Sequence, residues 1–573
     1  MAKSAYSISF IGIMENGTSC SSDLPWGHSL NVLKSGFLAL VMAGGMLPVS
    51  SALSAKERSD ATIRLHIDVA EPTGPIGKHL SGQHDWRLEW LDALDSPIAR
   101  RCCGHMWSDG AWPAEGEYNW TNLDEKVEAY LVGGRKLILA FSYVPRWLWS
   151  DPDDPALNER TIPGQFEFFD HIRIGNALPP ANYEKWEELI YQTVKHLNVD
   201  KQYGVIFEAW NEPNAAWFWR GTMEESLRLY EHTARAVKRA DPNTMIGGPT
   251  LAGGPTQRKH SPSGQASGYE WMETFIKYCA ENEVPVDFIS WHYYEYYARK
   301  YDRAVSFTDQ IQSVRDLIRK FPAIGNPKLV IDEWGYDWND SRDEEIKALI
   351  DSPYNSAWAA QSLYEMVTSG VDMAAYCASV GDSPDAPNPT FAVFEMFNRL
   401  GSVRLKTSIE NRNSKIGALA SGEESKISIL VWDFEENTEA ADSSPKSVQL
   451  NLDNLPAGDY QQARYLARIS HKFSTDLRNI GTGADFAGFA NLQGVDPASS
   501  APLPEAHTST RSSFARNEFY EKSGLANDTW KETSLLIAES KLLQSDGRAQ
   551  LEFELETNAV TLVELTPAAK ANQ

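Results

Sequence analysis

The chain has 573 residues, more than one compact core usually holds, so two domains are expected after processing. Its formal net charge of −25 opposes binding to polyanions, which excludes nucleic acid and anionic membrane surfaces as main partners. Aromatic residues make up 11% of the chain, with 19 Trp, which fits stacking on sugar faces as well as a large aromatic core.

The N-terminal segment has the pattern of a secretory signal. Lys34 precedes an apolar run over residues 36–48, and small residues follow as far as Ala55. The run is too short to span a membrane, so residues 1–55 are predicted to be a leader that is removed on export. This predicts a periplasmic or secreted protein with no stable membrane span after processing; a membrane tether is the alternative.

The cysteines do not have the pattern of a disulfide framework. They are few and irregularly spaced, at Cys20, Cys102, Cys103, Cys279 and Cys377. The neighbours Cys102 and Cys103 indicate either redox or metal chemistry or, more simply, two small residues at the end of a buried strand. The sequence has no CxxC, HExxH or Walker-type motif, so neither a metal nor a cofactor is expected.

Between residues 78 and 400, short apolar runs alternate with amphipathic helices. Continuous apolar strands are typical of a sheet buried on both faces, and such sheets are parallel. Seven runs stand at 97–99, 137–141, 205–207, 245–247, 286–289, 329–331 and 373–376, and an eighth strand is expected near 79–81. One helix should begin at Thr222, where Glu225 completes a capping box. Eight strand–helix units predict an α/β fold, a (β/α)8 TIM barrel over residues 78–400.

Beyond residue 400 the pattern changes to partly alternating strands. Examples stand at 427–432, 448–452 and 559–563, separated by turn-forming stretches such as 453–458. Residues 401–573 are therefore predicted to form an accessory C-terminal β-sandwich domain, with a long loop at 480–515. Residues 56–77 contain a further alternating strand, which is expected to join the sandwich before the chain enters the barrel.

Two acidic residues stand at the carboxyl ends of predicted barrel strands. Glu212 and Glu333 each follow a buried strand, the fourth and the seventh, and each has Trp nearby in the sequence. Catalytic side chains of such barrels lie at the carboxyl ends of the strands. A pair of carboxyl groups, one protonated and one ionised, is what cleavage of a glycosidic bond requires. A helix N-terminal acid or a surface acid would explain either residue alone, but not both together.

The sequence resembles family 39 of the glycoside hydrolases, a family of β-xylosidases and α-L-iduronidases with a retaining (β/α)8 barrel. The stretches that carry the resemblance are YEKW at 183–186, FEAWNEPN at 207–214 with Phe218-Trp219, IGGP at 246–249, VPVDFISWH at 284–292 and IDEW at 331–334. The Asn-Glu-Pro motif is shared by a whole clan of such enzymes, and the combination is what points to family 39. The resemblance spans about residues 60–568, including the sandwich.

The resemblance implies roles for four residues. Glu212 would be the general acid/base and Glu333 the nucleophile. Asn211 would bond the sugar 2-hydroxyl, and His292 would bind hydroxyls of the sugar that is cleaved off. From the residues alone, retention needs the two carboxyl groups roughly 5 Å apart, and Glu212 should have a raised pKa.

One stretch departs from the family pattern. The family commonly has Arg-x-His-Gly at the end of the second strand, with the His on the sugar, whereas this chain has RCCGH at 101–105. Either Cys103 replaces that His or His105 supplies it from a shifted loop. The first strand ends in Gln83-His84-Asp85, which could compensate.

Aromatic residues on the strand-end loops are candidates for the walls of a sugar pocket. They are Tyr143, Trp147, Trp149, Tyr293, Tyr294, Tyr336 and Trp338. About half of them should line the pocket, and Tyr294, Trp147, Tyr336 and Trp338 are the ones chosen as substrate-binding residues, together with Asn211, His292 and His105.

These features predict an O-glycosyl hydrolase that removes a terminal sugar from oligosaccharides or polysaccharides by double displacement, with β-xylosidase as the default activity. An α-L-iduronidase-like enzyme is the nearest alternative, and it would need a cation such as Arg146 or Arg101 at the sugar. An endo-acting hydrolase needs an open cleft, whereas the Trp-rich insertion at 143–180 favours a closed pocket. A transglycosidase would use the same residues. A non-catalytic carbohydrate-binding barrel is disfavoured because both acids are present.

Overall fold

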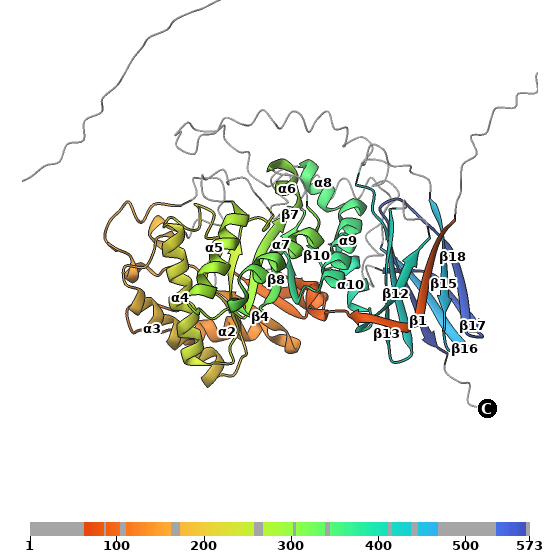
Figure 1. Cartoon of the computed structure of the whole chain (residues 1–573), viewed down its shortest axis with the longest axis horizontal. Helices are drawn as coiled ribbons and strands as arrows, with labels where there is room; N and C mark the ends of the chain where they lie inside the picture. The colour runs from red at the N-terminus through yellow and green to blue at the C-terminus, as the bar shows by residue number, and fades with distance from the viewer. Residues whose placement is uncertain are drawn as a thin grey trace, which may run out of the picture. The chain divides into compact units, whose positions relative to one another are not determined.

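The computed structural model describes residues 62–84, 88–102, 110–161, 172–256, 267–301, 305–337, 344–384, 386–410, 415–436, 445–467 and 535–568. The predicted leader and the loop predicted at 480–515 lie outside these residues. The described residues form a closed parallel barrel and a large, mostly antiparallel sheet (Figure 1). This confirms the predicted α/β fold with an accessory β domain. None of the described helices is both long enough and apolar enough to cross a membrane.

Eight parallel strands close the barrel, and neighbours in the chain are neighbours in space until the last pairs with the first. This order follows from the strand–helix alternation in the sequence, because each helix returns the chain to the same end of the barrel. The strands are β2 Gly82–Gln83, β3 Ile98–Arg101, β4 Lys136–Ala140, β5 Ile206–Glu208, β6 Ile246–Leu251, β7 Phe288–Tyr294, β8 Lys328–Gly335 and β9 Met373–Tyr376.

The first barrel strand begins later than predicted. Residues 79–81 belong to a 3-10 turn, Lys78–Ser81, and the strand is the short β2 that follows. Gly82 is the first residue of this strand. A Cβ there would lie 2.1 Å from Ile98 Cγ2 and 2.3 Å from the Ala374 carbonyl oxygen, so only glycine lets the first strand approach β3 and β9 closely enough to close the barrel.

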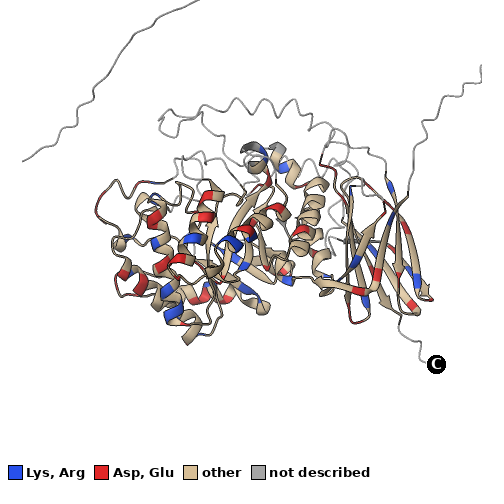
Figure 2. Ribbon diagram, viewed as in Figure 1, with Lys and Arg blue, Asp and Glu red and all other residues tan. Residues whose placement is uncertain are grey.

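Helices surround the barrel, and most of them begin where the sequence carries a capping residue. They are α1 Leu88–Ala93, α2 Trp120–Tyr130, α3 Tyr183–Val194, α4 Met223–Ala240, α5 Gly268–Glu281, α6 Glu295–Tyr301, α7 Phe307–Lys320, α8 Glu344–Ile350, α9 Pro353–Ser369 and α10 Pro389–Asn398. The predicted capping box of α4 is present: Thr222 Oγ1 accepts the Glu225 N–H at 3.1 Å, and Glu225 Oε2 accepts the Thr222 N–H at 2.7 Å. Acidic and basic residues are interspersed over the helices and the strands (Figure 2).

The second sheet has nine strands in the order β17-β16-β19-β14-β13-β12-β1-β15-β18. Its strands are β1 Ile63–Pro75, β12 Val403–Ile409, β13 Ile416–Glu423, β14 Lys426–Asp433, β15 Lys446–Asp453, β16 Gly458–Ala467, β17 Leu535–Ser545, β18 Arg548–Leu555 and β19 Val560–Pro567; β10 Gly381–Ser383 and β11 Ala386–Pro387 form a separate small pair. β1 precedes the barrel in the chain, yet it pairs antiparallel with β12 and parallel with β15.

The alternating residues of this sheet bury one apolar face in a core of their own. Eight of its strands, from β1 to β19 in chain order, contribute to a single buried cluster that includes Leu65, Ile429, Leu450 and Val563. The opposite face of β14 belongs to the barrel's cluster, and Trp432 donates its Nε1–H to Gln361 Oε1 of α9 at 3.0 Å. The sheet is thus fastened to the barrel by both apolar burial and a specific hydrogen bond.

The capping box of α4 should contribute measurably to stability. Thr222→Ala removes the side-chain acceptor for the Glu225 N–H, and the loss of such a cap costs about 1 kcal/mol. A urea unfolding curve should show a lower midpoint for Thr222→Ala and a midpoint near wild type for Thr222→Ser, which keeps the hydroxyl. Equal midpoints for the Ala and Ser variants would contradict this role.

Candidate active site

The inside of the barrel changes from apolar to charged along the strands. Six strands contribute one residue each to an apolar layer: Ile98, Ile138, Ile206, Phe288, Val330 and Met373. Side chains two positions apart point to the same face of a strand. On three of these strands the next inward residue is charged; these residues are Arg100, Glu208 and Asp332, and all three are fully buried. A charged layer thus stands directly above the apolar layer that closes the barrel.

Arg100 holds this layer together. Its Nε donates to Glu208 Oε2 at 2.9 Å, its Nη2 donates to Asn211 Oδ1 at 2.9 Å and lies 3.3 Å from Asp332 Oδ2, and its Nη1 contacts Glu333 Oε1. Burial alone would lower the pKa of Arg100, but the surrounding carboxylates, Glu208 first, raise it well above its usual value. The planar guanidinium suits this role because its donors are fixed in one plane.

A β-bulge brings Glu333 into the barrel beside Asp332. Ser290 of β7 pairs with Val330, whereas His292 pairs with Glu333, so β8 carries one extra residue between these two pairs. Bulges re-aim side chains and are frequent beside active sites. Here the extra residue allows two consecutive acids to reach the same interior. Glu333 also accepts a hydrogen bond from the Tyr294 hydroxyl, at 2.7 Å.

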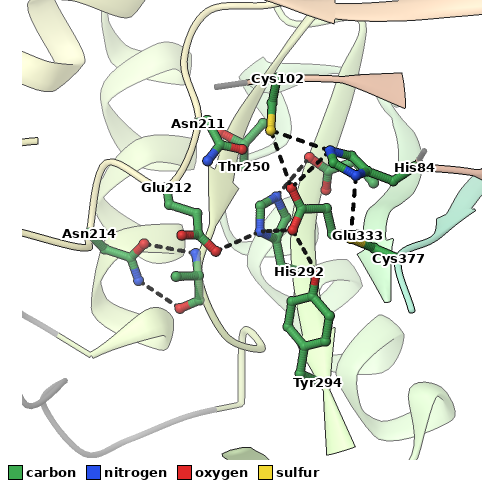
Figure 3. A network of polar contacts seen from close by, with 12 residues as sticks. His84, Cys102, Asn211, Glu212, Asn214, Thr250, His292, Tyr294, Glu333 and Cys377 are labelled. Atoms are coloured by element: carbon green, nitrogen blue, oxygen red, sulfur yellow. Dashed lines mark hydrogen bonds and ion pairs between the residues drawn. The ribbon is translucent and has the colours of Figure 1, made fainter. Parts of the chain in front are cut away.

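Glu212 stands on the loop that follows β5, in a strained backbone conformation. Its φ is 50°, which is uncommon for a residue other than glycine. Its N–H bonds the Thr250 carbonyl at 3.0 Å. Two residues later, Asn214 forms paired hydrogen bonds with the backbone of Ala252, at 2.8 and 2.9 Å (Figure 3). The end of β6 therefore fixes the loop on both sides of Glu212.

His292 joins the two candidate catalytic acids. Its Nδ1 lies 2.9 Å from Glu212 Oε1 and 3.4 Å from Glu333 Oε2, and its Nε2 lies 3.2 Å from Asp332 Oδ2 (Figure 3). An oxygen of Glu212 and an oxygen of Glu333 are within 4.8 Å of one another. Carboxyl groups this close match retaining glycosidases, because inverting enzymes need a wider gap that admits a water.

The environments of the two acids push their pKa values in opposite directions. Burial raises the pKa of Glu212, and the charge of Glu333 adds to this effect, although His292 opposes it. Burial would also raise the pKa of Glu333, but the positive charges of His292 and Arg100 hold that pKa well below its usual value. Glu212 thus favours the protonated form and Glu333 the ionised form, the division of roles that glycoside cleavage needs.

The positive and negative charges of the buried cluster are equal in number when the pKa shifts of Glu208 and His292 are included. Burial raises the pKa of Glu208 well above its usual value, and a hydrogen bond to Asp332 favours its protonated form. Burial would lower the pKa of His292, but Glu333 and Asp332 raise it well above its usual value. Arg100 and His292 are then cations, and Asp332 and Glu333 are anions. This balance explains how so many ionisable groups can be buried together.

His84 and two thiols occupy the other side of Glu333. His84 Nε2 lies 3.4 Å from Glu333 Oε1 and 3.3 Å from Cys102 Sγ, and its Nδ1 lies 3.3 Å from Cys377 Sγ (Figure 3). Burial lowers the pKa of His84 to about 3, so its ring is neutral. From the strand end Gln83-His84-Asp85, considered as a substitute for the family's strand-2 His, the structure brings His84 to Glu333. Asp85, Cys103 and His105 lie outside the described residues.

The remaining predicted substrate-binding residues are placed differently. Asn211 is buried against Arg100, as given above. Trp147 is partly buried and donates its Nε1–H to the Trp112 carbonyl at 3.1 Å. Tyr336 packs against Tyr354 and Trp358 in a small apolar cluster. Trp338 lies outside the described residues. Wall positions for these aromatic residues stay predictions.

The two cations considered for a uronic acid are both used elsewhere. Arg101 points outward from β3 and stacks over Tyr130 of α2, 5.7 Å from its ring centre. Arg146 donates two hydrogen bonds to the Pro152 carbonyl at 2.8 and 3.0 Å. Neither contact brings a cation to Glu212 or Glu333, so the structure does not favour the uronic acid alternative.

Comparison with known proteins identifies the family. The model of glycosyl hydrolases family 39 matches residues 117–458, more than half of the chain. The chain belongs to this family. It is 31% identical over 322 residues to a β-xylosidase of Geobacillus stearothermophilus (50% of this chain, 56% of the relative). It is 24% identical over 350 residues to a β-xylosidase of Caldicellulosiruptor saccharolyticus (55% and 63%). The match therefore spans less than two thirds of either relative.

Solved structures share the fold. A monomeric β-xylosidase from Caulobacter crescentus superposes with a TM-score of 0.62 at 17% sequence identity, over 88% of this chain and all of that one. At this identity the likeness concerns the fold alone. It extends over both the barrel and the second sheet, so the family 39 chain resembles this relative in domain organisation.

Sequence reasoning missed Arg100, Glu208 and Asp332 as parts of the site. The signal was present: each stands two positions after an apolar residue of a predicted strand and so on the inward face. A charged side chain inside a barrel must find a partner of opposite charge. His84 and Cys377 were harder to place, because they are 293 residues apart and meet only where the first and last strands close the barrel.

Arg100 should be the residue on which the site's stability depends most. Arg100→Met leaves buried carboxylates without their cation, and breaking a buried ion pair in this way costs about 3–5 kcal/mol. Urea unfolding should show this loss. Arg135→Met is the matched control, because Arg135 is also buried but its partner Asp92 is 55% exposed and can be solvated. Equal losses in both variants would contradict the special role of Arg100.

Proposed function

We propose that the protein is a retaining β-glycosidase that removes terminal xylose from β-xylosides. The observation that carries the proposal is the pair Glu212 and Glu333, close together, bridged by His292 and driven to opposite protonation states. The β-xylosidase relatives support xylose as the sugar. The predicted leader supports action outside the cytoplasm, where polysaccharide fragments are encountered.

In the proposed first step, Glu212 donates its proton to the leaving oxygen while Glu333 attacks the anomeric carbon. The new Glu212 carboxylate lies 2.9 Å from His292 Nδ1, so the imidazolium stabilises the charge that develops there. Arg100 and the Tyr294 hydroxyl hold one oxygen each of Glu333, which orients the carboxylate for attack. In the second step Glu212 removes a proton from a water molecule, whose oxygen attacks the anomeric carbon and displaces the Glu333 carboxylate, so the sugar is released with its configuration retained.

Azide rescue distinguishes the two acids. Glu212→Ala should lower kcat/KM by about 10²–10⁴ on an aryl β-xyloside with a poor leaving group, since general acid catalysis is lost. Added azide should restore turnover of an activated xyloside and yield the β-xylosyl azide. Glu333→Ala is the matched variant and should yield the α-xylosyl azide instead. If the anomers are exchanged, the two assigned roles are wrong.

A screen with other aryl glycosides tests the sugar separately. If another glycoside is cleaved faster than the xyloside, the choice of xylose falls while the assignment of the acids stands. If no aryl glycoside is cleaved, the exo-glycosidase proposal falls.

The pH profile should show the two shifted pKa values. Glu333 is active when ionised and its pKa is lowered, so activity should persist into acidic solution. Glu212 is active when protonated and its pKa is raised, so kcat/KM should fall only above the usual carboxyl range. A dinitrophenyl xyloside needs little acid assistance, so its kcat/KM should decrease much less at alkaline pH. Identical alkaline limbs for activated and unactivated xylosides would contradict the assignment of Glu212.

A further inference from the structure

The side chains of His84, Cys102 and Glu333 converge on a single point. His84 Nε2 and Cys102 Sγ are 3.3 Å apart, His84 Nε2 and Glu333 Oε1 are 3.4 Å apart, and Cys102 Sγ and Glu333 Oε1 are 3.6 Å apart. These three atoms, one of which belongs to the candidate nucleophile Glu333, form a nearly regular triangle (Figure 3).

The size of this triangle matches one face of a zinc tetrahedron. Zinc binds thiolate at about 2.3 Å, imidazole at about 2.0–2.1 Å and carboxylate at about 2.0–2.2 Å, which places neighbouring ligand atoms roughly 3.4–3.6 Å apart. The donor set of one sulfur, one nitrogen and one oxygen is also suited to zinc. Little movement of the three side chains is needed to close on an ion.

Two of the three residues, His84 and Glu333, are held in place by further contacts, as the ligands of a metal usually are. The second ring nitrogen of His84 bonds Cys377 Sγ at 3.3 Å, and Tyr294 and Arg100 hold the two oxygens of Glu333. Such outer partners orient ligands and strengthen metal binding. The contact of His84 Nδ1 with Cys377 leaves Nε2 facing Cys102 and Glu333.

We propose that His84, Cys102 and Glu333 form an inhibitory Zn²⁺ site. The ion would replace the thiol proton of Cys102, so one proton is released per ion bound. The fourth position would be taken by water. Binding of the ion stands on the geometry of the three side chains. Its inhibitory effect rests on the proposed function, because a Glu333 bound to zinc cannot attack the sugar.

The second cluster of possible ligands is less suitable. Glu212, His292 and Glu333 also have donor atoms within 4.8 Å of one another. Both ring nitrogens of His292 already contact carboxylates, Nδ1 that of Glu212 at 2.9 Å and Nε2 that of Asp332 at 3.2 Å. The first cluster offers a thiol, which binds zinc well, so the site containing the thiol is favoured.

Cobalt spectroscopy tests the binding without relying on activity. Co²⁺ added to the purified full-length chain should produce a near-ultraviolet thiolate-to-cobalt absorption band. Cys102→Ser should abolish the band, and Cys279→Ser, which changes a buried thiol on α5, should leave it intact. His84→Gln provides a second variant in case the first does not fold, and it should weaken cobalt binding. A band that survives Cys102→Ser, or that disappears only in Cys103→Ser or Cys377→Ser, overturns the assignment.

Zinc titration of xyloside hydrolysis tests the inhibition. Wild type and Cys279→Ser should lose activity as Zn²⁺ is added and recover it with EDTA. For Cys102→Ser, the zinc concentration that halves the activity should rise by a factor of at least about 10–100. This is the factor by which metal affinity falls when an outer partner of a ligand is lost, and loss of a ligand itself should cost no less. Cobalt binding without zinc inhibition would overturn the inhibitory role. If no glycoside is turned over at all, the proposed function has failed, and the cobalt band still decides the metal site.

Discussion

The site depends on one buried cation. Arg100 has no exposed surface, and its guanidinium contacts Glu208, Asp332 and Glu333 at once. Removing three carboxyl groups from water, those of Asp332 and Glu333 in the ionised form, is costly, and only paired charges with good hydrogen-bond geometry offset that cost. The same contacts orient Glu333. Through Asp332 they also reach His292, which in turn contacts Glu212. The position of the acid/base is therefore coupled to an arginine on another strand.

The different protonation of the two acids follows from an asymmetry in this network. Glu333 lies inside it, where Arg100, Tyr294 and His292 all stabilise its charged form. Glu212 lies at its edge, on a loop, and has only His292 as a close positive neighbour among the contacts described. The bulge in β8 creates this asymmetry, because without the extra residue Glu333 would not share the interior with Asp332. The bulge in the β8 backbone thus determines which of the two acids is held in its charged form.

The sequence was sufficient for the fold and for the two acids, and insufficient for what surrounds them. Apolar runs reveal a barrel because most residues on both faces of each strand pack against apolar neighbours. Glu212 was recognisable from its motif and its place at a strand end. To predict the residues around them, one must know which side chains of every strand point into the barrel. One inserted residue in β8 reverses the alternation at Glu333. The contact of His84 with Cys377 exists only after ring closure, which no local pattern records.

The placement of β1 has a consequence for how the chain is made. β1 leaves the ribosome before any barrel strand, yet it lies between β12 and β15, which are translated after the barrel. The barrel strands can associate in order of synthesis, whereas β1 must wait with both of its edges unpaired. An exposed strand edge is a template for unwanted pairing. The wait ends only when the last third of the polypeptide, which contains β12 and β15, emerges.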